Sequence, residues 1–125
     1  MKTAELFDYF LRSRKVTTDT RNISKDCIFF ALKGANFNGN TFAQQAIEQG
    51  ALLAIVDEAE YENTEQHIYL VEDALEALQD LARFYRIHLR IPVIGLTGSN
   101  GKTTTKELIS AVLKEKFKTH YTFGN

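Results

Sequence analysis

The sequence contains one cysteine, one proline and no tryptophan among its 125 residues. A single cysteine cannot form an internal disulfide, and Cys27 lies in an apolar run without a basic neighbour, which predicts a buried structural thiol. The longest apolar runs, 27–32 and 51–56, are far shorter than the roughly 20 residues that span a bilayer. The amino-terminal segment lacks the apolar core of a secretory signal. We therefore expect a cytoplasmic protein that does not bind membranes.

An excess of charge of either sign is also missing. Fifteen lysine and arginine residues stand against sixteen aspartate and glutamate residues, and the formal net charge is -1. This balance provides no positive field that would attract nucleic acid. The hydrophobic fraction of 44% and the charged fraction of 25% are ordinary for a globular protein. The length suits one compact domain, or one small domain and part of another.

The apolar residues are grouped as in an α/β protein. Residues 27–32, 51–56 and 68–71 are short apolar runs with the length of buried strands. Residues 4–12 predict a helix with one apolar face, formed by Leu6, Phe7, Phe10 and Leu11. Residues 16–21 predict a polar connector with a short strand. The segment 33–40, rich in glycine and asparagine, predicts a loop.

Two further helices have recognisable start signals. Thr41 and Gln44 fit a capping box, and the helix that they open should end at Gly50. Asp73 and Glu76 repeat the pattern before a second helix, which should end ahead of Pro92. The apolar stripe expected on that helix consists of Leu75, Leu78, Leu81, Ala82 and Tyr85.

The segment 97–104, Thr-Gly-Ser-Asn-Gly-Lys-Thr-Thr, lies between a predicted strand at 93–96 and a predicted helix at 103–117. Glycines allow backbone N–H groups to turn toward an anion, and a helix N-terminus adds its positive dipole end. The strict phosphate-loop pattern has glycine at the position of Leu96, so the match is to a shortened form. A glycine-rich turn with a solvated lysine is the alternative. We expect nucleotide binding, with ATP or GTP both open, by Gly98, Ser99, Asn100, Gly101, Lys102, Thr103 and Thr104.

Within this loop Lys102 and Thr103 have distinct expected roles. Lys102 supplies a cation for the β and γ phosphates and is the candidate catalytic residue. The Thr103 hydroxyl is the candidate ligand of Mg²⁺. The predicted helix that follows should turn Leu108, Ile109, Val112 and Leu113 inward.

The segment 97–104 resembles the phosphate loop of the Mur ligases and folylpolyglutamate synthases, which share its shortened spacing. Lys106-Glu107 and the segment 121–125 resemble the branch of the Mur ligases that adds D-alanyl-D-alanine. Asp19-Thr20-Arg21, 27–34 and 37–42 resemble the uridine-diphosphate-binding domain of that branch and of the branch that adds the third residue. Asn40 departs from the pattern, because many relatives carry histidine there.

The resemblance implies an ATP-dependent ligase with Mg²⁺ that joins D-alanyl-D-alanine to UDP-N-acetylmuramoyl-tripeptide through an acyl phosphate. It also implies that the UDP-linked substrate contacts Asp19, Thr20, Arg21, Lys33, Gly34, Asn38 and Gly39. Arginine offers phosphate a rigid fork and lysine a point charge. The alternatives are a surface ion pair for Arg21, a solvated loop charge for Lys33 and a turn residue for Asp19.

The expected fold class is α/β. We expect a small α/β UDP-binding domain at 1–88, then at 89–125 the first strand, phosphate loop and helix of a truncated, Rossmann-like ATP-binding domain. The fragment alone should bind without turnover, and the full-length protein should be a monomer. The alternatives are a ligase that adds the third residue, a folylpolyglutamate synthase, a non-catalytic UDP-sugar-binding module and a P-loop regulatory or motor domain.

The remaining histidine, glutamate and phenylalanine residues do not predict a further functional site. His67, His88 and His120 have no spacing that predicts a metal site. The acidic stretch with Glu58, Glu60, Glu62 and Glu65 predicts a solvated loop between two strands. Phe29, Phe30, Phe37 and Phe42 are expected in the core rather than in a stacking platform.

Overall fold

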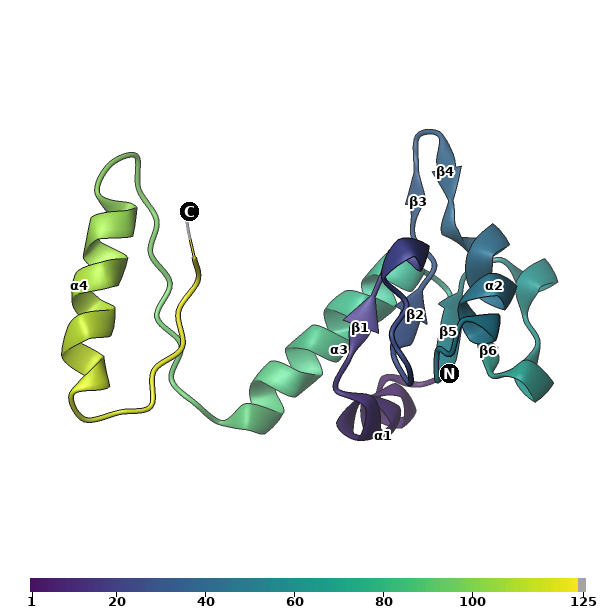
Figure 1. The fold of residues 1–125 in the computed structure, drawn as a ribbon, viewed down its shortest axis with the longest axis horizontal. Coiled ribbons are helices and arrows are strands. Elements are labelled where there is room, and N and C mark those ends of the chain that lie inside the picture. The colour runs from purple at the N-terminus through teal and green to yellow at the C-terminus, as the bar shows by residue number, and fades with distance from the viewer. Residues whose placement is uncertain (124–125) are drawn as a thin grey trace. The chain divides into compact units, whose positions relative to one another are not determined.

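The computed structural model describes residues 1–123, and the chain divides into two compact units. The first unit is Met1–Arg90, and the second begins at Ile91 (Figure 1). The first unit contains a parallel sheet with helices on both faces, which confirms the α/β prediction. None of the helices within residues 1–123 is long and apolar enough to cross a membrane.

Four parallel strands form the sheet of the first unit. They are β1 (Val16–Thr17), β2 (Ile28–Phe30), β5 (Leu53–Val56) and β6 (Ile68–Leu70), in the order β1-β2-β5-β6. Every residue of β2 and β5 is buried, because these two central strands have helices on both sides. This explains why their sequences are continuous apolar runs rather than alternating ones.

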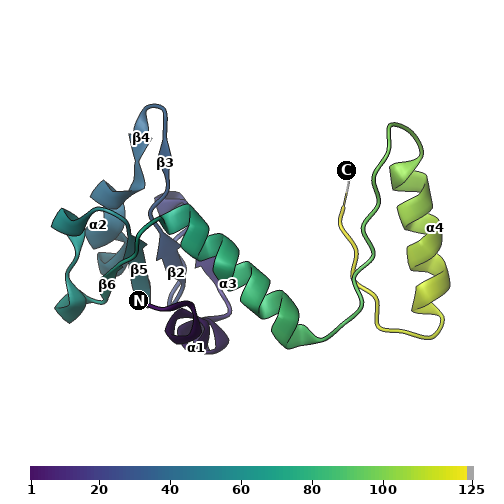
Figure 2. The same ribbon diagram turned by 180° about the vertical axis from the view of Figure 1, so that it is seen from behind.

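The helices cover the two faces of the sheet unequally. One face packs against α1 (Thr3–Ser13) and α3 (Ala74–Leu89), and the other against the short α2 (Ala43–Glu48) (Figures 1 and 2). Alternate residues of each strand divide between the layers: Phe30 meets α1 and α3, whereas Phe29 lies in the cluster of α2. The unit is therefore a three-layer α/β/α sandwich.

Helix α3 begins as predicted, but its buried stripe is rotated. The Asp73 side chain accepts a hydrogen bond from the backbone N–H of Glu76 at 2.9 Å, which confirms the cap. The prediction that Leu75 and Ala82 face inward is wrong, since both are exposed. The side chains that reach the sheet and α1 are those of Ala74, Ala77, Leu78, Leu81 and Tyr85. Leu75 fits the apolar period of the helix, but small alanines rather than this leucine fill the close contact with the rest of the unit.

The predicted loop 33–40 is partly ordered as a hairpin. Strands β3 (Lys33–Gly34) and β4 (Phe37–Asn38) pair antiparallel, and the hairpin projects from the top of the first unit in Figure 1. A 3₁₀ helix, η2 (Gly39–Phe42), leads into α2. The predicted capping box at Thr41 is wrong: its hydroxyl donates to the carbonyl of Asn38 at 2.9 Å, because Asn38 is the residue that caps η2. Gly50, with φ 108°, follows α2 in the left-handed conformation, as predicted.

Strand β6 lies at one edge of the sheet, and its outward backbone groups have partners. Asn63 forms an isolated antiparallel bridge with Ile68, donating to its carbonyl at 3.0 Å and accepting from its N–H at 2.9 Å. The amino group of Met1 donates to the carbonyl of Leu70 at 3.2 Å. Two short 3₁₀ helices, η3 (Ala59–Tyr61) and η4 (Thr64–Gln66), connect β5 to this edge.

Over its described residues, 91–123, the second unit contains one helix, α4 (Lys102–Lys114), with irregular segments on either side. The predicted strand at 93–96 is wrong, because a strand of a parallel sheet needs neighbours to accept its hydrogen bonds. Leu108 and Val112, predicted to face inward, are 64% and 71% exposed, while Ile109 and Leu113 are partly covered. The helix thus has the predicted position, and its apolar face has no sheet to cover it.

Gly39 is the glycine of the first unit at which an added Cβ atom would clash with neighbouring backbone. A Cβ atom there would lie 2.6 Å from the carbonyl oxygen and 2.8 Å from the nitrogen of Leu32. The close approach lets the N–H of Gly39 donate to the Leu32 carbonyl at 2.8 Å, where the hairpin returns to the sheet. Backbone rather than a flexible side chain blocks the space, so the clash has no easy relief.

We predict that Gly39→Ala destabilises the chain by about 1–3 kcal/mol, because the added methyl forces the hairpin away from Leu32. Urea unfolding followed by circular dichroism measures the difference. Gly34→Ala is the matched control, since its Cβ would meet only the Cβ of Phe37 at an ordinary 3.8 Å. Equal stability of the two variants would contradict the role given to Gly39.

Candidate functional site

The carboxyl ends of the four parallel strands bring most of the predicted substrate-binding residues to one edge of the sheet. Asp19, Thr20 and Arg21 follow β1, and Lys33 and Gly34 follow β2. Asn38 and Gly39 end the hairpin that begins at Lys33, while Asp57 and Glu58 follow β5. Ligands of open parallel sheets bind at this edge, because loops from neighbouring strands meet there. The topology therefore collects these segments where a ligand is expected.

Asp19 and Arg21 form a fork-to-fork ion pair just beyond β1. The Arg21 Nη2 and Nε atoms donate to the Asp19 carboxylate at 2.8 and 3.0 Å, and the backbone N–H of Arg21 donates at 2.9 Å. Hydrogen bonding from the Arg21 side chain is the main reason that the pKa of Asp19 is lowered. The Arg21 side chain remains 87% exposed, so its guanidinium is accessible to a ligand while Asp19 fixes its direction. Thr20 begins the 3₁₀ helix η1 (Thr20–Asn22) between them.

Lys33, at the base of the hairpin, has two carboxylate partners. Its Nζ atom lies 3.1 Å from Oδ1 of Asp57 and 3.0 Å from Oε1 of Glu58. Hydrogen bonds to Glu58 first and to Asp57 second raise the pKa of Lys33. The interpretation of Glu58 as part of a solvated acidic loop is therefore wrong. Its side chain is only 28% exposed and is bound to the hairpin.

Asn40 is fully buried and connects the hairpin to the end of β5. Its side-chain amide donates to Oδ1 of Asn38 and to Oδ1 of Asp57, both at 2.9 Å, and its Oδ1 accepts from the backbone N–H of Asp57 at 3.0 Å. Every polar atom of this side chain has a partner, which makes its burial tolerable. The Asn38 side chain also both accepts and donates: its Oδ1 accepts from the backbone N–H of Asn40, and its amide donates to Glu58, each at 3.0 Å.

Asp57 completes the network. Its Oδ2 accepts from the backbone N–H of Ala74 at 3.1 Å, at the first residue of α3. Burial opposes the charged form of this carboxyl, but the hydrogen bonds from Ala74 and Asn40, with the Lys33 ammonium, outweigh it and lower the pKa of Asp57. One carboxylate therefore joins the hairpin, the central strand β5 and helix α3.

The glycine loop of the second unit leads directly into α4 and contains two glycines with positive φ angles. Gly98 and Gly101 have φ angles of 145° and 78°, which other residues rarely adopt. Gly101 caps α4, so Lys102, Thr103 and Thr104 form the first turn, and the N–H groups of that turn are directed toward the loop. Ser99, Asn100 and Lys102 are exposed. Lys102 thus stands at the head of the helix, and phosphate binding by this loop stays a prediction.

Residues beyond α4 fold back onto it. Lys106, only 14% exposed, donates to the carbonyl of Thr122 at 2.7 Å and lies 3.5 Å from Glu107. The ammonium of Lys114 lies 4.3 Å above the ring of Tyr121. The two segments that carried the resemblance to the D-alanyl-D-alanine-adding branch are thus in contact. Gly124 and Asn125, the end of that motif, lie outside the described residues.

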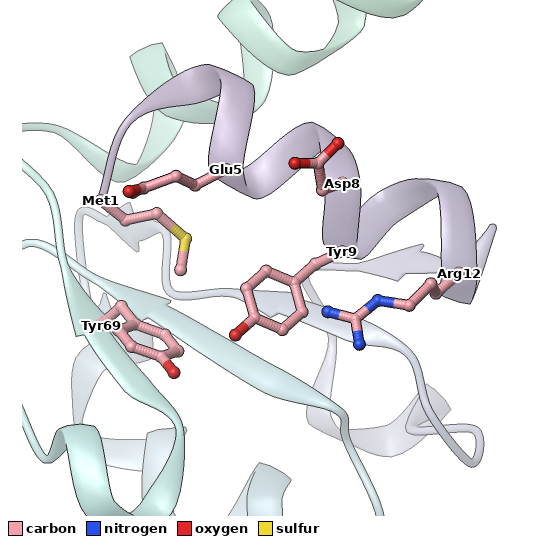
Figure 3. Close-up of a pocket in the computed structure, with 6 residues that line it drawn as sticks. All are labelled: Met1, Glu5, Asp8, Tyr9, Arg12 and Tyr69. Carbon is pink, nitrogen blue, oxygen red and sulfur yellow. The ribbon is translucent and has the colours of Figure 1, made fainter.

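Arg21, Lys33 and Lys102 do not line either of two hollows in the surface. One, of about 380 Å³, is lined by Met1, residues of α1 and Tyr69 of β6 (Figure 3). A hydrogen bond with Tyr9 raises the pKa of Tyr69 there. The other, of about 310 Å³, lies between the start of α2 and the segment 60–63. Within residues 1–123 no group of three or more histidine, cysteine, aspartate or glutamate side chains could hold a metal ion.

Comparison with known proteins identifies the family. A model described as the Mur ligase family, catalytic domain, matches residues 13–86, more than half of the chain. A model described as the Mur ligase middle domain matches residues 96–125.

The chain belongs to the Mur ligase family.

Individual Mur ligases agree with this assignment. The chain is 46% identical over 111 residues to UDP-N-acetylmuramoyl-tripeptide--D-alanyl-D-alanine ligase of Bacillus subtilis (strain 168), covering 88% of this chain and 24% of that protein. The Synechocystis sp. protein of the same name is 43% identical over 118 residues, covering 92% and 26%. A 2,6-diaminopimelate-adding ligase of Aquifex aeolicus is 37% identical over 106 residues, covering 83% and 22%. The chain thus spans about a quarter of the length of these relatives.

Solved Mur ligase structures share the fold. The crystal structure of MurF ligase from Thermotoga maritima in complex with ADP has a TM-score of 0.71 at 34% identity, covering 85% of this chain and 24% of that one. Crystal structure II of MurF from Acinetobacter baumannii has a TM-score of 0.75 at 36% identity, covering 89% and 24%. Nucleotide binding is therefore a property of the family, while the residues that bind in this Mur ligase stay predictions.

Two members of the network, the buried Asn40 and the largely covered Asp57, were not identified from the sequence. Asn40 was noted only as a departure from the family pattern, and Asp57 was not singled out. A signal for Asp57 was present, because a carboxylate directly after a buried parallel strand lies at the ligand edge of the sheet. Nothing local marks Asn40, since asparagine is equally common in exposed turns. Its burial depends on partners 17 residues away in the sequence.

We predict that Asp57→Asn lowers the free energy of unfolding by about 2 kcal/mol at neutral pH, because one acceptor of a buried network is lost. The folded pKa of Asp57 lies below the ordinary value of 3.8. Its contribution is therefore complete above about pH 4 and lost as the pH falls through the folded pKa. Urea titrations between pH 3 and 7 should show the two proteins converging in acid. Asp8→Asn, at an exposed position of α1, is the control.

Proposed function

We propose that this chain is part of an ATP-dependent ligase that joins D-alanyl-D-alanine to UDP-N-acetylmuramoyl-tripeptide. The observation that carries the proposal is the glycine loop at the head of α4, where Gly98 and Gly101 have positive φ angles and Gly101 caps the helix. The 46% identity to a relative named for this reaction supports the substrate assignment. The ADP complex of a structurally similar MurF ligase supports the assignment of ATP as the nucleotide.

The proposed reaction has two steps. A carboxylate oxygen of the UDP-linked tripeptide attacks the γ-phosphorus of ATP, and ADP leaves, which gives an acyl phosphate. The amine of D-alanyl-D-alanine then attacks the acyl carbon. The tetrahedral intermediate collapses with release of phosphate and a proton, leaving the new amide. Charge builds on the transferred phosphoryl group in the first step, so its neutralisation is the main task of the site.

In this proposal the loop residues Gly98, Ser99, Asn100, Gly101 and Thr104 hold the phosphates of ATP through backbone and hydroxyl groups. Lys102 neutralises charge on the β and γ phosphates. The Thr103 hydroxyl would hold Mg²⁺, which supplies further positive charge at the same oxygens. The position of Lys102 and Thr103 in the first turn of α4 supports these roles.

The UDP-linked substrate is proposed to bind at the carboxyl edge of the sheet. Arg21 offers an exposed, pre-oriented guanidinium to the diphosphate, and Lys33 an ammonium. Thr20, Gly34 and the Asp19 carboxylate complete the predicted contacts. Asn38 and Gly39 are further proposed contacts, and their hydrogen bonds within the protein also shape the hairpin. The lone, buried Cys27 supports a location in the cytoplasm.

A ligase that adds the third residue is the second candidate, supported by the 37% identity to the diaminopimelate-adding relative. Both kinds of ligase use a UDP-linked substrate and ATP, so the contacts at these residues would serve either. A substrate-by-substrate assay of the full-length protein separates them. Product formation with UDP-N-acetylmuramoyl-dipeptide and an amino acid, but not with D-alanyl-D-alanine, would favour the second candidate.

We predict that Lys102→Ala in the full-length protein lowers ligase activity by at least about 100-fold, because the phosphoryl charge loses the cation proposed to neutralise it. The assay measures phosphate release with all three substrates present. Lys118→Ala, another exposed lysine of the second unit, is the matched control and should retain activity. Unchanged ATP use in the Lys102 variant would overturn the assignment of the loop.

A second prediction concerns the 125 residues alone. They span about a quarter of the relatives' length and should therefore bind ligand without turnover. The measurement is ADP release in the presence of ATP, UDP-N-acetylmuramoyl-tripeptide and D-alanyl-D-alanine. Release that requires both of the last two substrates would refute this expectation.

A further inference from the structure

Lys33, the cation proposed to bind the substrate's diphosphate, lies beside more negative charge than it can neutralise. Lys33 lies within 3.1 Å of two carboxylates, Asp57 and Glu58, so the three side chains have a formal charge of -1. Arg21, which follows the neighbouring strand β1, has its charge neutralised by the ion pair with Asp19. An anion that approaches Lys33 is therefore repelled unless one carboxylate moves away.

Asp57 is fixed in place. Its side chain is 12% exposed, and its two oxygens accept from Asn40 and from the first N–H of α3 in addition to Lys33. Moving it would leave one N–H of the fully buried Asn40 side-chain amide without an acceptor. Asp57 is therefore a positioning residue that holds Lys33 at the edge of the sheet whether or not a ligand is present.

Glu58 is held much more loosely. Its two donors, Nζ of Lys33 and Nδ2 of Asn38, both belong to the hairpin and both reach the same oxygen, Oε1, at 3.0 Å. Although Glu58 stands at the start of η3, its side chain does not cap that helix. Lys33 is 46% exposed and Glu58 28%, so water can replace either partner, and exposed ion pairs of this kind contribute little.

Oε1 of Glu58 therefore occupies the place of an anionic oxygen held by one ammonium and one amide. A phosphate oxygen offers the same acceptor with the same charge, and it would receive both donors when Glu58 leaves. We propose that Glu58 is a displaceable counter-ion that competes with the diphosphate of the UDP-linked substrate for Lys33 and Asn38. This rests on the proposed function, in which Lys33 contacts that diphosphate.

The test is calorimetric titration of UDP into the 125-residue chain. Glu58→Gln keeps the acceptor oxygen for Asn38 but removes the competing charge, so it should bind UDP about three- to tenfold more tightly than the unaltered chain. Lys33→Ala should bind UDP about tenfold more weakly. Glu60→Gln makes the same charge change at an exposed position two residues away and should leave the affinity unchanged. Uridine, which lacks the diphosphate, should bind both glutamine variants equally.

The outcomes separate this inference from the proposed function. Weaker UDP binding in Lys33→Ala together with no tightening in Glu58→Gln overturns the displacement alone. Equal tightening in Glu60→Gln also overturns it, because a general charge effect would then explain the result. If Lys33→Ala has no effect, or if UDP does not bind measurably, the proposed substrate site fails and the inference with it. Unfolding of both Glu58→Gln and Glu58→Ala, seen by circular dichroism, would make Glu58 a required structural residue and sink the proposal.

Discussion

A single carboxylate, that of Asp57, holds together the edge of the sheet at which the candidate substrate site lies. The hairpin β3–β4 has only two residues in each strand and would not be stable by itself. Asp57 connects it, through Lys33 and Asn40, to the central strand β5 and to the start of α3. Because these partners come from four segments of the chain, the position of the hairpin depends on the whole first unit.

The two candidate phosphate sites use different physical means. The proposed site at α4 would use backbone N–H groups and a helix end, whose partial charges are fixed by geometry. The edge of the sheet relies on the side chains of Arg21 and Lys33, which are already paired with carboxylates. As proposed, the first site would be formed before a ligand arrives, whereas the second would exchange one anion for another.

Sequence reasoning succeeded where a local property decides the structure. The apolar runs at 27–32 and 51–56 contain the central strands, Asp73 caps α3, and the glycine loop leads into α4. It failed where distant partners decide. Segment 93–96 has the composition of a strand but no neighbouring strand, and Leu75 fits the helical period yet faces water. The site shows the same division: Lys33 was found, but Asn40 and Asp57, which position it, interact across 17 residues.

The bridge between Asn63 and Ile68 has a consequence for the behaviour of the protein in concentrated solution. A sheet built from strands as apolar as β2 and β5 is at risk of recruiting a strand from another molecule along an open side. At β6 that recruitment would have to break bonds that Asn63 makes with both backbone groups of Ile68, and to displace the amino group of Met1 from Leu70. This side of the sheet is thereby protected against edge-to-edge aggregation.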